Sequence, residues 1–85
     1  MARQRPLEVI ERAEFVTVGE LVRLTGMRYS TLKFYTEEGL LSFRQEEANL
    51  TRRYPRLETL TRIEEIRRLK AEGRSVPQIK EMLRR

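Results

Sequence analysis

The sequence predicts a mostly α-helical fold with four main helices and a small two-stranded β-hairpin. Apolar residues recur at helical spacing in four segments, and two of those segments begin with a helix-capping pattern. Between the second and third segments, two short strand-like runs flank a polar loop. The 85 residues suffice for one domain, which we place over residues 15–85, after an N-terminal extension over residues 1–14.

The extension holds a candidate short helix over residues 6–13. Pro6 suits the first turn of a helix, and Leu7, Ile10 and Glu11 would share one of its faces. A helix this short is not stable alone, so it must pack on the domain or fray.

The first main helix is expected to begin after Thr17. Thr17 and Glu20 have the spacing of a capping box, in which each side chain bonds the backbone N–H of the other residue. The buried side of this helix is supplied by Val18, Leu21, Val22 and Leu24. Gly26 is placed to end the helix in the left-handed conformation.

A second helix is expected over residues 28–38, directly after a tight turn at residues 25–27. Leu32 and Tyr35 are three positions apart and can face the core, and Gly39 stops the helix. Two short helices joined by such a turn are typical of a helix-turn-helix, in which the second helix enters the major groove of DNA.

A β-hairpin follows the two helices. Residues 40–44 and 50–54 predict two short strands, residues 45–49 predict the loop between them, and Pro55 closes the second strand. A hairpin after a helix-turn-helix forms a wing, so the predicted architecture is a winged helix-turn-helix.

Two more helices are expected after the hairpin. The third covers residues 57–71, where an apolar residue at every third position produces a broad face, and Gly73 ends it. Its apolar residues are Leu57, Leu60, Ile63, Ile66 and Leu69. Ser75 and Gln78 form a second capping box, for the fourth helix. The buried side of that helix holds Ile79, Met82 and Leu83.

The composition argues against an enzyme and against a metal site. The chain has no His and no Cys, so the common general base near neutral pH and the ordinary zinc ligands are absent, and no disulfide can form. We therefore expect no catalytic residue, no cofactor and no metal. No apolar run approaches the roughly 18 residues that span a membrane, and no secretory signal is visible, so we expect a cytoplasmic protein without a membrane partner.

The charge favours nucleic acid as the partner. Eighteen Lys and Arg against 13 Glu produce a net charge of +5, and fifteen of the cations are Arg. Arginine forms bidentate hydrogen bonds with phosphate and with guanine. Solubility is an alternative explanation, because many small domains carry several excess charges. An acidic membrane surface fits less well, because no helix pairs a basic face with a large aromatic face.

Residues 15–83 resemble the N-terminal DNA-binding domain of the MerR family of bacterial transcription regulators. The matching pieces, in chain order, are VGELVRLTG at 18–26, TLKFYTEEGLL at 31–41, RRY at 52–54, IRRL at 66–69 and GRS at 73–75. Each piece alone is weak, but the set in this order and spacing is specific. The resemblance implies a winged helix domain that binds promoter DNA as a dimer, distorts it and adjusts transcription. RNA polymerase at the promoter is then a second candidate partner.

The family's usual dimerising helix and effector-binding domain are missing from this chain. It is either a fragment or a short member that acts by DNA binding alone. We therefore expect a monomer or a weak, DNA-assisted dimer, with a homodimer as the alternative if a C-terminal helix is missing.

Several positions depart from the family's pattern. Arg28 stands where Ser or Thr usually opens the recognition helix, and the lost cap typically costs about 1 kcal/mol. Lys33 replaces an arginine and would meet a phosphate without the bidentate fork. Phe34 replaces the first of two tyrosines. Leu50 and Thr51 replace a Gly-Tyr pair, so the wing turn is expected to differ.

Four residues at the start of the second helix are expected to face the major groove: Arg28, Tyr29, Ser30 and Lys33. With Leu32 and Tyr35 inward, positions 29, 30 and 33 lie mostly outward. Arg28 also offers a phosphate contact. The alternative is an ordinary solvated helix face.

The wing and the first helix are expected to contact phosphates. Arg52 and Arg53 form a clamp that Arg44 assists, but neighbouring strand side chains point to opposite faces, so the first two cannot act by the same route. Charged protection of a strand edge is the alternative. Thr17 and the N-terminus of the first helix offer backbone amides to a phosphate. The predicted DNA-binding residues are Thr17, Arg28, Tyr29, Ser30, Lys33, Arg44, Arg52 and Arg53.

Tyr35 and Tyr54 are expected in the core rather than on the DNA. The basic stretch Arg62, Arg67 and Arg68 is expected to pair with Glu58, Glu64 and Glu72, and a flanking DNA-backbone contact is the alternative.

The predicted function is sequence-specific binding of double-stranded DNA for transcriptional regulation. One alternative is a DNA-bending or recombination-accessory factor, which the sequence does not separate from a regulator. Another is a protein-interaction winged helix, which would expose an apolar rather than a basic patch. Single-stranded RNA binding would need exposed stacking aromatics, and the chain has only six aromatic residues.

Overall fold

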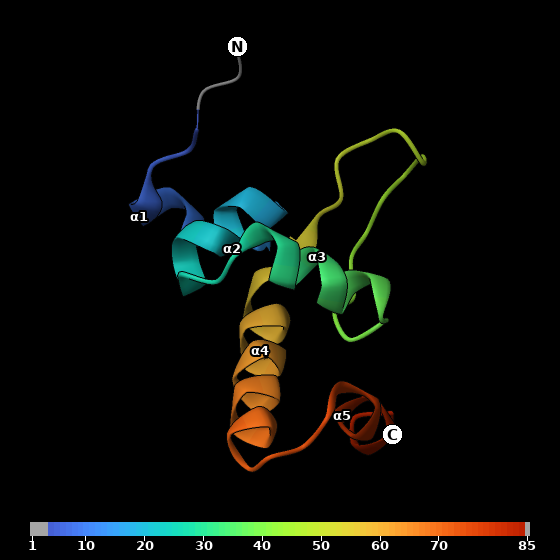
Figure 1. Ribbon diagram of the computed structural model, residues 1–85. Coiled ribbons are helices and arrows are strands. Elements are labelled where there is room, and N and C mark those ends of the chain that lie inside the picture. Colours follow the sequence, from blue (N-terminus) through green and yellow to red (C-terminus); the bar gives the residue numbers. More distant parts are fainter. Residues whose placement is uncertain (1–3, 85) are drawn as a thin grey trace.

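The computed structural model describes residues 4–84, so residues 1–3 of the expected extension and residue 85 lie outside the described part. That part contains five helices and two short strands, in the order α1 (Leu7–Ile10), β1 (Phe15–Val16), α2 (Val18–Thr25), α3 (Tyr29–Glu37), β2 (Tyr54–Pro55), α4 (Arg56–Ala71) and α5 (Val76–Met82). In Figure 1, α2 and α3 lie across one end of α4, and α5 packs near its other end. The mostly helical architecture with a small antiparallel sheet confirms the predicted fold class.

Both predicted capping boxes are present. The Thr17 hydroxyl oxygen accepts the Glu20 N–H at 3.2 Å, and Glu20 Oε1 accepts the Thr17 N–H at 2.9 Å. Ser75 and Gln78 make the same reciprocal pair at the start of α5. By contrast, Arg28 occupies the N-cap position of α3 without a side-chain capping bond, as the missing Ser or Thr predicts.

The turn between α2 and α3 depends on a left-handed glycine. Gly26 has φ 73°, and its N–H donates to the Val22 carbonyl at 2.8 Å, which ends α2. Only glycine reaches this region without strain. From α4, Arg67 donates Nη2–H to the Thr25 carbonyl at 3.0 Å. The turn is therefore fixed both by its own backbone and by the long helix beneath it.

The core joins side chains from all five helices. Ile10 of α1, Leu21 of α2, Leu32 of α3, Ile63 of α4 and Ile79 of α5 are fully buried. The extension is thus fastened to the rest of the chain through Ile10, although α1 covers only four residues and leaves Leu7 exposed.

Tyr35 and Tyr54 lie in the core, as predicted. Tyr54 is 2% exposed, and its hydroxyl lies 2.9 Å from the hydroxyl of Thr36. Thr36 donates its only hydroxyl hydrogen to the Leu32 carbonyl at 2.9 Å, so Tyr54 is the donor in that pair. The buried hydroxyls therefore form a short chain that ties β2 to α3.

Leu57 lies outside the buried face of α4, although the three-residue repeat counted it among the residues of the predicted apolar face. Leu57 is 69% exposed, whereas Ile63, Ile66 and Leu69 are buried. A repeat of three drifts around a helix that turns every 3.6 residues, so its first member lies off the buried face. Thr59, four residues before Ile63, takes the buried position instead.

The strands predicted for the hairpin were also wrong in their bounds. Strand β2 pairs antiparallel with β1, with Val16 opposite Tyr54, and residues 40–43 form no strand. Leu40 and Leu41 are both buried, whereas successive strand residues alternate between two faces. The two limbs of the predicted hairpin meet at one bridge, Arg44 opposite Arg53. Residues 44–53, which we call the wing, form a loop that projects away from the helices in Figure 1.

No helix within residues 4–84 is long and apolar enough to cross a membrane.

Candidate nucleic-acid interface

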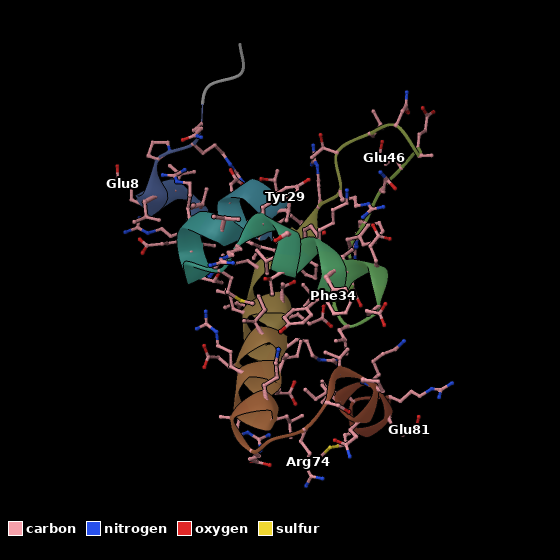
Figure 2. All side chains as sticks on the ribbon, in the orientation of Figure 1. Glu8, Tyr29, Phe34, Glu46, Arg74 and Glu81 are labelled. Carbon is pink, nitrogen blue, oxygen red and sulfur yellow. The ribbon has the colours of Figure 1, made fainter. Side chains whose placement is uncertain are left out.

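The outer face of α3 carries the side chains predicted for the major groove. Tyr29, Ser30 and Lys33 are exposed, while Leu32 is fully buried. Tyr29 is 54% exposed, which is the largest exposure among the aromatic side chains of residues 4–84. In Figure 2, Tyr29 lies above α3 and Phe34 lies below it, so the exposed face is broad. Arg28 is exposed at the start of the helix.

A groove of about 390 Å³ separates α3 from the wing. One wall comes from α3 through Tyr29, Lys33 and Glu37, and the other from the wing. The remaining lining residues are Thr17, Val18, Gln45, Leu50, Thr51, Arg52 and Tyr54. This α3–wing groove therefore brings together four of the predicted site residues: Thr17, Tyr29, Lys33 and Arg52.

Arg52 is oriented by contacts on both sides of its guanidinium. Its Cζ lies 4.6 Å from the centroid of the Phe43 ring, and its Nη1 lies 3.4 Å from Glu37 Oε1. Both members of the ion pair are substantially exposed, so the pair contributes little to stability. The ion pair does partly neutralise the charge of Arg52, and it orients the Arg52 guanidinium toward Glu37 of α3.

Arg53 faces Arg44 across the base of the wing, whereas Arg52 faces α3. Arg44 and Arg53 exchange backbone hydrogen bonds at 2.7 and 2.8 Å, so their side chains project from the same face of the ribbon. Arg44 lies over the Phe15 ring, with Cζ 5.0 Å from the centroid. Neither arginine forms an ion pair with a carboxylate of residues 4–84. The facing pair on the wing is therefore Arg44 with Arg53, and Arg52 lines a different groove from Arg53.

The N-terminus of α2 is already partly occupied by its own capping box. The Thr17 and Glu20 amides are bonded, which leaves the Val18 and Gly19 amides of the first turn without an intrahelical partner. Glu20 brings a negative charge to this end of the helix. The Arg5 guanidinium bonds that carboxyl and holds its pKa below the ordinary value, so it remains ionised and paired.

The model of the MerR HTH regulatory protein family matches residues 16–85 of the chain. The chain belongs to this family. Membership confirms the resemblance drawn from the sequence, and it makes the chain a DNA-binding transcription regulator rather than an enzyme. Neither the curated proteins nor the solved structures contain a significant match to it.

The basic residues of α4 in this MerR domain serve mainly to bind other parts of the chain. Arg67 lies 3.6 Å from Glu64 and Arg68 lies 3.5 Å from Glu72, as predicted. Arg62 pairs with Glu65 at 3.5 Å rather than with Glu58, and it also donates to the Leu40 carbonyl at 3.3 Å.

Sequence reasoning missed two residues beside the predicted interface of the MerR domain. Phe34 is 45% exposed and lies on the other side of α3 from Tyr29 in Figure 2; the helical period alone could have placed it there. Arg5 binds Glu20, fifteen residues away, and no local pattern signals that contact.

Proposed function

We propose that this MerR domain binds double-stranded DNA sequence-specifically, with α3 in the major groove and the wing against the phosphate backbone. The observation that carries the proposal is the α3–wing groove, whose walls present Tyr29 and Lys33 on one side and Arg52 on the other. An exposed helix beside a basic wing has the form of a groove-reading element with a backbone contact at its edge.

The residues of α3 have chemistry suited to base edges. The short Ser30 hydroxyl both donates and accepts, the Lys33 ammonium is a donor to guanine, and the Tyr29 ring can pack against a thymine methyl. Arg28 is exposed at the start of the helix and would contact a phosphate. These four residues would define the sequence preference and the register of the helix on the duplex.

Phosphate contacts are assigned to Arg44 and Arg53. They face one another without carboxylate partners among residues 4–84, so a phosphate would relieve their mutual repulsion. Arg52 has a weaker role because Glu37 shares its charge. The Thr17 hydroxyl oxygen accepts the Glu20 N–H, so its hydrogen remains free to be donated to a phosphate of the DNA backbone.

At a promoter, such binding would regulate transcription. We propose that one chain occupies one half-site, that DNA aligns two copies, and that RNA polymerase is the partner whose access changes. A regulator of chromosomal DNA acts in the bacterial cytoplasm.

Selection from random duplex DNA tests the proposal. We expect an enriched inverted repeat, and a logarithmic binding constant that falls linearly with the logarithm of salt concentration. Lys33→Ala should weaken binding to the selected site, whereas Lys70→Ala, the same charge change on exposed α4, should not. Failure to enrich any duplex sequence would overturn the proposal.

A further inference from the structure

Arg5, in the segment before α1, is held against the start of α2. Its Nε and Nη2 each donate to one oxygen of Glu20 at 2.7 Å, and Nη2 also donates to the Phe15 carbonyl at 3.1 Å. Arg23 of α2 donates in turn to the Arg5 carbonyl. Both the side chain and the backbone of Arg5 are therefore fixed to the domain.

The Arg5 guanidinium still has unused donors. A guanidinium has five N–H groups, and the contacts to Glu20 and Phe15 use the one on Nε and those on Nη2. The two hydrogens on Nη1 have no acceptor among residues 4–84. Because these donors are held in place by the other contacts, they are preorganised for an additional acceptor.

Arg5 lines a second groove, of about 400 Å³, between the start of α2 and the wing. Arg53 and Thr51 lie on its wing side, and Thr17 and Glu20 on its α2 side. We call it the arm–wing groove, where the arm is the segment before α1 that contains Arg5. Thr17 and Thr51 also line the α3–wing groove, so the two grooves adjoin. A duplex that lies along one would pass over the other.

The charges of the arm–wing groove suit one phosphodiester. Arg5 cancels the charge of Glu20, so the groove retains one net positive charge, from Arg53. A backbone phosphate carries one negative charge and two free oxygens. These oxygens match the Arg5 Nη1 donors on one wall and the Arg53 guanidinium on the other.

We propose that the arm–wing groove binds a backbone phosphate of the DNA, contacted by Arg5 and Arg53. The inference rests on the proposed function and extends it, because it makes the segment before α1 part of the interface. Arg5 then has two roles: it neutralises Glu20 beside the DNA and it donates directly to a phosphate.

Salt titrations of Arg5→Gln, Arg53→Gln and the double variant with the selected duplex test this site. Each single variant should weaken binding to all duplex sequences alike and should lower the salt slope by about one. Arg12→Gln is the matched control, since Arg12 is exposed just after α1, in the same N-terminal extension, and its side chain has no bonded partner within residues 4–84. Equal slopes for Arg5→Gln and Arg12→Gln would overturn this site, while selective binding by the unchanged chain would leave the proposed function intact.

The variant Arg5→Gln/Glu20→Gln separates the two roles of Arg5. It has the net charge of the unchanged chain, and glutamine still completes the capping box. If Arg5 contacts a phosphate, the Arg5→Gln/Glu20→Gln variant still binds DNA weakly and keeps the lowered salt slope. Recovery of the original affinity and slope would show that Arg5 only neutralises Glu20, and would overturn the proposal. Thermal unfolding of each variant by circular dichroism checks that the fold is retained.

Discussion

Arg44 and Arg53 face each other across the base of the wing, and each backbone N–H donates to the carbonyl oxygen of the other residue. Like charges that lie directly opposite in an antiparallel pair destabilise it slightly. The stacking of Arg44 over Phe15 holds one of the two guanidinium groups in place. The wing thus presents two positive charges on the same face of its paired backbone, where an anion could contact both.

Arg44→Gln should weaken binding to every duplex sequence alike and lower the salt slope by about one, because a phosphate contact is lost. The free energy of unfolding should change by less than about 0.5 kcal/mol, as for most surface substitutions. Arg74→Gln is the control, since Figure 2 shows Arg74 at the far end of the molecule from the wing. Equal losses of slope in fluorescence-anisotropy titrations of the two variants would contradict the wing assignment.

Two glycines of α2 should respond in opposite directions to alanine. Gly26→Ala should lower the free energy of unfolding by about 1–2 kcal/mol, because alanine is strained at φ 73° even though its Cβ has open space. Gly19→Ala should raise it by about 0.5–1 kcal/mol, because alanine favours the helix and its nearest neighbour would be Thr17 Oγ1 at 3.9 Å. Urea denaturation measures both, and a stabilising Gly26→Ala would refute the turn geometry.

The buried hydroxyl chain predicts a contrast between two tyrosines. Tyr54→Phe should cost about 1 kcal/mol of unfolding free energy, because the hydrogen bond to Thr36 is lost inside the core. Tyr29→Phe should leave that free energy unchanged, because its hydroxyl lies on the exposed face of α3. An unchanged free energy of unfolding for Tyr54→Phe in denaturant titrations would show that the Tyr54 hydroxyl contributes nothing.

The Arg5–Glu20 pair predicts a pH dependence of stability. The hydrogen bonds from Arg5 lower the folded-state pKa of Glu20 below its ordinary value of 4.5. The contribution of the ionised Glu20 carboxylate to the free energy of unfolding is therefore fully present above the unfolded-state pKa. It is lost as pH falls through the folded-state pKa. The difference in melting temperature between the unchanged chain and Glu20→Gln should shrink as pH is lowered from 7 to below 4.5. A constant difference across this range would contradict the pairing.

Local signals in the sequence predicted much of the helical framework. The capping box at Thr17 and the left-handed Gly26 depend only on residues a few positions apart, so their patterns are visible in the chain itself. The outward direction of Tyr29 and Lys33 likewise follows from the helical period. These signals placed the recognition helix and most of its exposed face.

Contacts between distant segments were not predictable in the same way. The pairing of Val16 with Tyr54 and the contact of Arg5 with Glu20 depend on the folded arrangement. Alternation along a presumed strand separated Arg52 from Arg53, but it could not identify Arg44 as the residue that faces Arg53. Leu40 and Leu41 are both buried in the helical core, and this tertiary contact could not be read from the apolar run that predicted a strand over residues 40–44.

In the proposed complex, the outer face of α3 and the wing together form the DNA-binding surface. Backbone amide NMR spectra, recorded as the selected duplex is added, locate that surface residue by residue. We expect the largest shift changes at Tyr29, Ser30 and Lys33 and along residues 44–53, with small changes at α5. Shift changes that cluster on α4 and α5 while α3 and the wing stay unaffected would show that the DNA binds elsewhere on the domain.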